Sequence, residues 1–211
     1  MKILEKILVL IFGTHSDIAT IIISMFPIIE LKGAIPIGMS ADLWGVHSLS
    51  GEKAFILSLI GSSIVVPMIA LTFTPLLKWF SSTKFFKNTA TVINEKVNKH
   101  SNKIEAQSLS SNKKPRTWLR CLLLFLFVAV PLPLTGVWTG TCVGVVMGLR
   151  LWQILLFVIT GNIIAGLIIY FVLAIFPAIT TILALIFLAI AIIVMAYLFY
   201  KIFLQRKKNS E

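Results

Sequence analysis

Three long apolar stretches divide the charged residues of this chain. Ala54 to Leu77 contains 24 residues without a charge, Cys121 to Leu149 contains 29, and 50 uncharged residues lie between Arg150 and Lys201. A membrane-spanning helix needs about 20 mainly apolar residues. The first stretch therefore predicts one transmembrane helix. The third, interrupted at Phe176-Pro177-Ala178, predicts two helices joined by a tight turn.

The second stretch has a proline- and glycine-rich segment in its middle, which leaves two shorter apolar pieces, Thr117 to Val130 and Val137 to Leu149. Each would be about 20 Å long as a helix, whereas the apolar core of a bilayer is about 30 Å thick. A hairpin that enters and leaves on one side fits these lengths. A single span is the alternative, but it would place the basic tail after Lys201 outside the cell, against the bias of basic segments for the cytoplasm.

Residues 17–45 show a similar pattern. Ser16 or Asp17 is expected to cap a short helix that runs to about Ile29, and a second short piece continues to Trp44. Neither piece is long enough to cross, so we predict another re-entrant hairpin. Residues 1–13 are also too short to cross and are expected at the interface; without a small-residue cleavage pattern, they are expected to be retained.

Together these elements predict an all-α integral membrane protein built as a single membrane domain, residues 1–211. Two inverted repeats, each a re-entrant hairpin followed by a transmembrane helix, are expected at 14–77 and 117–175. Gly61-Ser62 and Gly161-Asn162 lie at similar depths in their two helices. The remaining parts are a basic segment at 78–116, one extra C-terminal transmembrane helix at 178–202 and a basic tail at 203–211.

Composition and charge support the same class. With 58% hydrophobic and 13% charged residues, the chain is too apolar for a soluble domain. Ten of its 19 Lys and Arg residues lie between Lys78 and Arg120, which indicates cytoplasmic segments of a multi-pass protein of the cell membrane, not a nucleic-acid-binding protein. Spacing within 83–105 suggests an amphipathic helix on the membrane surface, although a solvated linker fits the second half equally well.

An acid and a base stand inside the first predicted hairpin, at Glu30 and Lys32. Ionisable groups at membrane depth are expensive and therefore indicate function. Glu30 is the candidate proton-coupling group, because apolar surroundings allow a carboxyl to exchange a proton near neutral pH. Lys32 either pairs with Glu30 or faces a cavity and contacts an anionic head group. Asp42 is a second candidate proton-coupling acid, or a surface carboxylate.

Free amides at the helix breaks are the other candidate binding groups, because the N-termini of half-helices attract anions. Glycines there would let a ligand approach the backbone, or would simply allow helices to pack closely. Trp138 could contact substrate, plug the cavity or pack. With Lys32, the candidate substrate-binding residues are Gly33, Pro36, Gly38, Pro131, Pro133, Thr135, Gly136, Trp138, Thr139, Gly140 and Asn162.

No cofactor, metal site or enzymatic centre is expected. His15, His47 and His100 are dispersed, and Cys121 and Cys142 lack the CxxC spacing of a metal or redox pair. The sequence also lacks a Walker A loop, an HExxH motif and a Ser-His-Asp set. Secondary transport fits these observations better than catalysis.

Two motifs resemble those of the small multidrug export protein family. They are Glu30-Leu-Lys-Gly-Ala-Ile-Pro36 and Pro131-Leu-Pro-Leu-Thr-Gly-Val-Trp-Thr139, with Lys32 where the family usually has arginine. More remotely, the chain is similar to the DedA/VTT superfamily, which implies opposed re-entrant loops and includes carriers of polyprenyl phosphate and lipid scramblases. Glu30 and Asp42 resemble the acidic pair of that superfamily, whereas the arginines of its second loop have no counterpart here.

We therefore expect a transporter or flippase for an amphipathic substrate, with polyprenyl phosphate or another anionic lipid favoured and with protons or Na⁺ as the coupling ion. The first alternative is export of cationic drugs by proton antiport, with Glu30 as counter-charge. The second is a membrane scaffold that recruits partners through 83–105. Membrane lipids and the substrate are the expected partners, with a homodimer enclosing the cavity as a further possibility.

Overall fold

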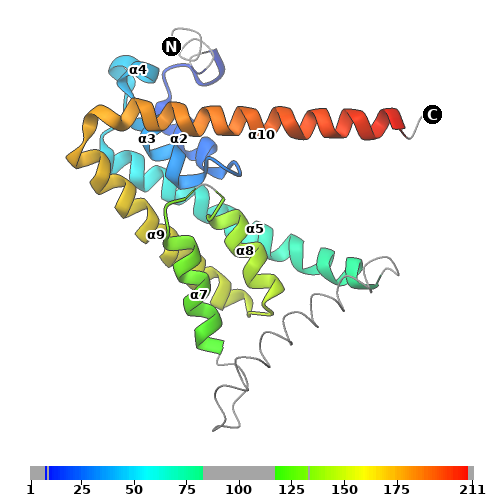
Figure 1. The fold of residues 1–211 in the computed structure, drawn as a ribbon. Coiled ribbons are helices and arrows are strands. Elements are labelled where there is room, and N and C mark those ends of the chain that lie inside the picture. Colours follow the sequence, from blue (N-terminus) through cyan, green and yellow to red (C-terminus); the bar gives the residue numbers. More distant parts are fainter. Residues whose placement is uncertain (1–7, 9, 83–116, 133, 209–211) are drawn as a thin grey trace.

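The computed structural model describes residues 8, 10–82, 117–132 and 134–208 (Figure 1), and its regular elements within these ranges are all helices. The predicted all-α class is thus confirmed for this part of the chain. The amphipathic helix expected at 83–105 lies outside the described residues, as does most of 1–13. The helices are α2 (Ser16–Met25), α3 (Glu30–Met39), α4 (Ala41–Trp44), η1 (Gly45–His47), α5 (Gly51–Ser82), α7 (Thr117–Ala129), α8 (Val137–Val146), α9 (Leu151–Ile175), η2 (Pro177–Ile179) and α10 (Thr180–Lys208).

Three of these helices are long and apolar enough to cross a membrane. The candidate spans are Gly51–Leu77, Leu151–Ile175 and Pro177–Lys201, which agree with the three transmembrane helices expected from the sequence. The last two are separated at Phe176, where the backbone leaves the helical region and Pro177 starts a short 3₁₀ turn. The protein is therefore an integral membrane protein.

The first short pair, α2 and α3, forms a hairpin whose two ends meet. The Ser16 hydroxyl donates a hydrogen bond to the carbonyl of His47, 2.5 Å away. The prediction that Ser16 or Asp17 caps α2 is consequently wrong: the N-cap residue is His15, and no side chain caps it. The Ser16 hydroxyl instead connects the start of the first hairpin to the 3₁₀ turn that follows it.

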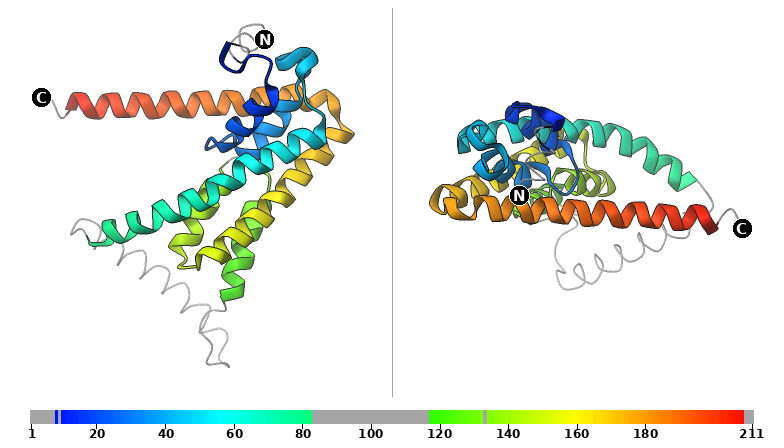
Figure 2. Two further views of the ribbon diagram at one scale, coloured as in Figure 1. Left: turned by 180° about the vertical axis from the view of Figure 1, so that it is seen from behind. Right: turned by 90° about the horizontal axis from the view of Figure 1, so that it is seen from above.

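The second short pair, α7 and α8, is a hairpin of the same kind. Its helices agree with the predicted half-length pieces, and the chain between them passes through the proline-rich break. Arg120 near the start of α7 donates a hydrogen bond to the carbonyl of Met147 directly after α8, at 3.2 Å. Figures 1 and 2 show the two hairpins beside opposite ends of the long helices α5 and α9.

The two halves also pack alike. A Cβ added to Gly61 of α5 would overlap the carbonyl of Ile21 and the side chain of Ser24, both in α2. A Cβ added to Gly161 of α9 would lie 2.8 Å from the carbonyl of Phe125 and 3.0 Å from Cβ of Val128, both in α7. Each glycine thus faces a carbonyl, and the residue three positions later, in the first short helix of its own half. Small residues permit such close approach of helices in membranes.

The long helices α5 and α9 meet at the centre of the molecule. There the side-chain amide of Asn162 donates a hydrogen bond to the hydroxyl of Ser62 at 2.8 Å, and both residues are fully buried. The two glycine-polar pairs noticed in the sequence therefore lie together. This contact joins the first half of the protein to the second.

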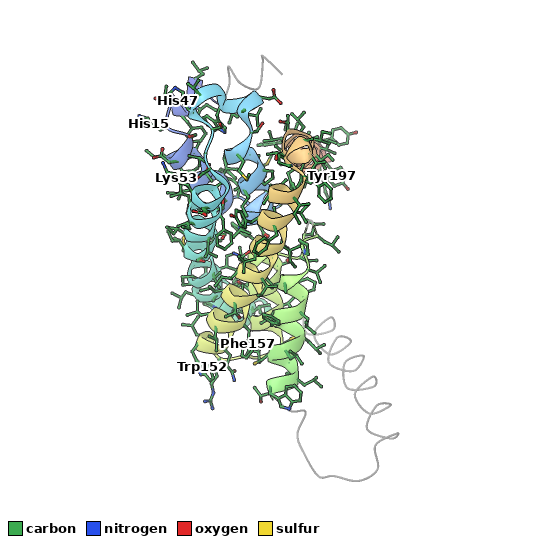
Figure 3. The ribbon with its side chains drawn as sticks, turned by 90° about the vertical axis from the view of Figure 1, so that its left-hand side faces the viewer. His15, His47, Lys53, Trp152, Phe157 and Tyr197 are labelled. Carbon is green, nitrogen blue, oxygen red and sulfur yellow. The ribbon has the colours of Figure 1, made fainter. Side chains whose placement is uncertain are left out.

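The last helix, α10, crosses the others at a steep angle. Figure 3 views it nearly along its axis, whereas α5 and α9 extend down the length of the picture. Its first turns pack against α3 through the buried Ala184 and Phe187. Further along, large apolar side chains are exposed, among them Ile192, Ile193 and Phe199. Exposed apolar side chains on a membrane helix are suited to contact with lipid.

Candidate functional site

The two candidate charged residues lie where the first hairpin turns. Glu30 is the first residue of α3, and Lys32 follows within the same turn. Both are buried, with 4% of Glu30 and 1% of Lys32 exposed. Their side chains reach the break in the second hairpin, about a hundred residues later in the chain.

Lys32 binds the backbone that follows α7. Its ammonium group donates to the carbonyls of Val130 at 3.0 Å, Leu132 at 3.2 Å and Thr135 at 3.0 Å, and lies 3.0 Å from the Thr135 hydroxyl. The carbonyls at the C-terminal end of a helix lack partners within the helix and carry partial negative charge. Lys32 therefore satisfies carbonyl groups that the helix break exposes.

Glu30 binds the start of α8. Its Oε1 atom accepts a hydrogen bond from the backbone N–H of Trp138 at 3.0 Å. Its carboxylate also lies directly over Gly136, the N-cap residue of α8, so closely that a Cβ on Gly136 would overlap Oε2. The N-terminal amides of a helix carry partial positive charge and attract anions. In effect, Glu30 caps a helix of the other hairpin.

Each charge thus lies against the helix end of opposite polarity. Among the described residues, no ion pair joins Glu30 to Lys32, so the first expected alternative is not the arrangement seen. A third contact runs in the reverse direction, because the indole N–H of Trp138 donates to the carbonyl of Met25, the last residue of α2, at 3.0 Å. We call this set of residues the clasp: Glu30, Lys32, Thr135, Gly136 and Trp138.

The backbone on both sides of the clasp is strained. Ile28, Glu30 and Leu134 have φ angles of 80°, 47° and 71°, in the left-handed region that residues other than glycine rarely adopt. Such conformations cost about 1–3 kcal/mol each and tend to occur at functional sites. Among the residues that the structure describes, the three strained positions other than glycine lie in the two hairpin turns, which are the parts that the clasp holds together.

Most of the other candidate glycines pack against side chains. A Cβ on Gly33 would meet Ile29 and Phe187, one on Gly38 would meet Thr20, and one on Gly140 would meet Val128. These three positions fit the helix-packing interpretation of the sequence. Gly136 differs from them, since only this candidate glycine has a carboxylate as its nearest neighbour.

The remaining candidate residues are distributed around the clasp. Pro36 is buried inside α3, Pro131 lies in the second turn, and Pro133 is outside the described residues. The Thr139 hydroxyl donates to the carbonyl of Leu134 at 2.5 Å, within the same turn. Asn162 is bonded to Ser62, as described above.

Asp42 is not brought to the clasp. It is an exposed residue of α4 whose Oδ2 atom accepts a hydrogen bond from the hydroxyl of Thr181 in α10, at 2.7 Å. This contact gives Asp42 a position beside the last helix. The sequence had not indicated Thr181, nor the backbone carbonyls that surround Lys32. The only signal for those carbonyls was the proline-rich break, because prolines end helices.

Residues 30–168 match a protein family described as putative small multi-drug export protein. The chain belongs to this family. The matched range covers more than half of the chain, starts at Glu30 and includes every residue of the clasp. No curated protein and no solved structure matches the chain. Membership confirms the resemblance seen in the sequence and supports an export or transport role without indicating a substrate.

Proposed function

We propose that this small multidrug export family protein is a secondary transporter in which two re-entrant hairpins, related as inverted repeats, meet tip to tip within the membrane. Helices α2, α3 and α8 each contain 10 residues, which corresponds to about 15 Å, half of a bilayer core. Two hydrogen bonds, Ser16–His47 and Arg120–Met147, each link the start of a hairpin to the residues that follow its second helix. Each hairpin therefore begins and ends on the same side. The matching contacts of Gly61 and Gly161 support a repeated design. Transporters built in this way bind substrate where broken helices meet.

The clasp is the gate in this proposal. With the Glu30 carboxylate on the amide of Trp138 and the Lys32 ammonium among three carbonyls, the hairpin tips are held together. The N-terminus of α8 stabilises the negative charge of the Glu30 carboxylate. Protonation of Glu30 removes this charge and therefore weakens its hydrogen bond to the Trp138 amide. Release of the carboxylate then frees the α8 amides. Glu30 therefore acts as the proton-coupling group, as expected from the sequence.

The observation that carries the proposal is the position of the Glu30 carboxylate directly over Gly136. A place that holds a buried carboxylate against helix amides can also hold the anionic head group of a substrate. We propose that the substrate is an amphipathic anion, with polyprenyl phosphate or a similar anionic lipid favoured. Its head group would replace Glu30 at the α8 amides, next to the Lys32 ammonium.

A cationic drug is the second candidate substrate, and a different part of the clasp favours it. The carbonyls of Val130, Leu132 and Thr135 already hold an ammonium group, that of Lys32. A cationic substrate could take the place of Lys32 there and use Glu30 as its counter-charge. In that case protons and substrate would compete, as in proton antiport.

Reconstituted vesicles can test the proposal. We expect the wild-type protein to translocate a phosphorylated polyprenyl lipid at a rate that responds to an imposed pH gradient. Glu30→Gln should remove the response to the gradient, and Lys32→Ala should slow translocation. Asp17→Asn and Lys53→Ala serve as matched controls, because both residues lie outside the clasp; Lys53 is exposed and Asp17 is partly exposed. Uptake of a cationic dye in parallel vesicles distinguishes the two substrates, and equal rates for wild type and both clasp variants would refute the proposal.

A further inference from the structure

A groove of about 220 Å³ lies on the surface between the start of α5 and the end of α9. Glu52, Phe55 and Ile56 line it from α5, and Leu167 and Tyr170 line it from α9. None of these residues belongs to the clasp. The groove combines one acidic residue, two aromatic residues and two aliphatic residues.

Two glycines hold the aromatic rings in place. A Cβ on Gly51 would lie 2.8 Å from Cε2 of Tyr170, and a Cβ on Gly166 would lie 2.7 Å from Cε2 of Phe55. The two rings are 6.4 Å apart between centroids and inclined by 41°, so their faces are not stacked on each other. Each ring is only partly buried. The glycines therefore position two ring surfaces beside the groove.

Charge indicates what such a groove can bind. Glu52 is exposed and supplies the single formal charge among the five lining residues. Glu52 lies in the first turn of α5, where the helix dipole stabilises any carboxylate. The dipole explains the acid but not the two aromatic rings beside it. A carboxylate together with aromatic faces is a combination that recognises organic cations. The aliphatic residues Ile56 and Leu167 provide contact for an apolar body.

We propose that this groove binds lipophilic organic cations, with the cationic centre between the Glu52 carboxylate and the rings of Phe55 and Tyr170. The apolar substituents of the cation would lie along Ile56 and Leu167. The complementarity of charge and of apolar surface selects this class of ligand over an anionic one. The inference goes beyond the proposed function, since the site and its residues are separate from the clasp.

The groove is nevertheless close to the clasp within the fold. Gly166 lies against both Phe55 and Leu31, and Leu31 is the residue between Glu30 and Lys32. Leu31 and Phe55 also belong to one hydrophobic cluster. A cation in the groove would consequently lie against the same packing layer that supports the two charged residues.

Binding of tetraphenylphosphonium to the purified full-length protein in detergent tests the inference, with tetraphenylborate as an anion of the same shape. We expect the wild type to bind the phosphonium at least about tenfold more tightly than the borate. Glu52→Gln should weaken phosphonium binding about tenfold, because it removes the charge at nearly constant size, and Tyr170→Leu should weaken it further. The melting temperature of each variant checks that it is folded.

Matched variants separate this site from the clasp. Asp17→Asn removes a partly exposed acid that belongs neither to the groove nor to the clasp, and it should leave phosphonium affinity unchanged. If Glu30→Gln abolishes binding while Glu52→Gln leaves it intact, the cation binds at the clasp and the groove is not its site. Equal affinity for phosphonium and borate, or no phosphonium binding, would also overturn the inference, whereas translocation of a phosphorylated lipid would still test the proposed function separately.

Discussion

The substitution Gly136→Ala should weaken the contact between the hairpin tips without replacing a charged residue. Gly136 has a φ of −104°, so the backbone itself accepts alanine. The added methyl group would overlap the Glu30 carboxylate. Because the methyl group is fixed to the backbone, the carboxylate must leave its position on the Trp138 amide.

The expected cost follows from what the displaced carboxylate loses. A hydrogen bond to a charged group contributes about 1.5–3 kcal/mol, and a charge at a helix N-terminus adds about 0.3–1 kcal/mol. Together these give a destabilisation of roughly 2–4 kcal/mol. In a chain of this size each kcal/mol lowers the melting temperature by about 2–4 °C, so Gly136→Ala should lower it by roughly 4–16 °C.

A double-mutant cycle turns this value into a test of the contact. The melting temperature in detergent would be followed by tryptophan fluorescence for wild type, Gly136→Ala, Glu30→Ala and the double variant. Once Glu30 is alanine, the methyl group occupies vacated space, so Gly136→Ala should cost only a few tenths of a kcal/mol. Gly144→Ala is the matched control on the same helix: its methyl group meets Ile154 and Leu124, and its cost should be the same with or without Glu30. An equal cost of Gly136→Ala in both backgrounds would show that the carboxylate does not lie over Gly136.

Three further predictions concern strain, charge and topology. Leu134→Gly should raise the melting temperature in detergent, equivalent to about 1 kcal/mol, because Leu134 has a φ of 71° and is 59% exposed; a decrease would contradict the strained turn. Lys32→Met should lower the melting temperature in the same assay, because three carbonyls lose a charged donor, while Lys32→Arg should retain most of it; equal values for the two variants would argue against the role of charge. The third test uses a variant without Cys121 and Cys142, with single new cysteines at Ser16, Gly45, Arg120 or Arg150. Cysteines at Ser16 and Gly45 should be labelled from one side of the membrane, and those at Arg120 and Arg150 from the other side. Labelling of the two members of either pair from opposite sides would exclude re-entrant hairpins.

The helices were predictable because the signals for them are local. The length of an apolar run indicates whether a helix can cross, and the prolines at 131, 133 and 177 mark the places where helices end. The half-length pieces at 117–130 and 137–149 agree with α7 and α8 for this reason. The end of α2 was less accurate, because the helix ends at Met25 and not near Ile29. Pro27 marks the earlier end, because a proline disfavours helical backbone at the residue before it, and Phe26 is extended.

The contacts of the charged residues could not be predicted in the same way. The sequence offered two alternatives for Lys32, pairing with Glu30 or facing a cavity; in the described residues its ammonium forms no ion pair with Glu30 and binds backbone oxygens instead. Its acceptors are mainly backbone carbonyls 98 to 103 residues away, and a backbone carbonyl has no side-chain pattern that a sequence could show. Likewise, Gly136 and Gly140 cannot be distinguished in the sequence, although one lies under a carboxylate and the other against a valine.

In the proposed transporter, the separate hydrogen-bond partners of Glu30 and Lys32 would allow the two contacts between the hairpins to break one at a time. Had the two residues formed a buried ion pair, neutralising the acid would have left the ammonium without a counter-charge, at considerable cost. Here the Lys32 ammonium has hydrogen-bond acceptors of its own, the carbonyls after α7, in addition to the nearby Glu30 charge. In the proposed transporter, one contact could therefore break while the other still holds the hairpin tips together, so the tips would never be fully detached.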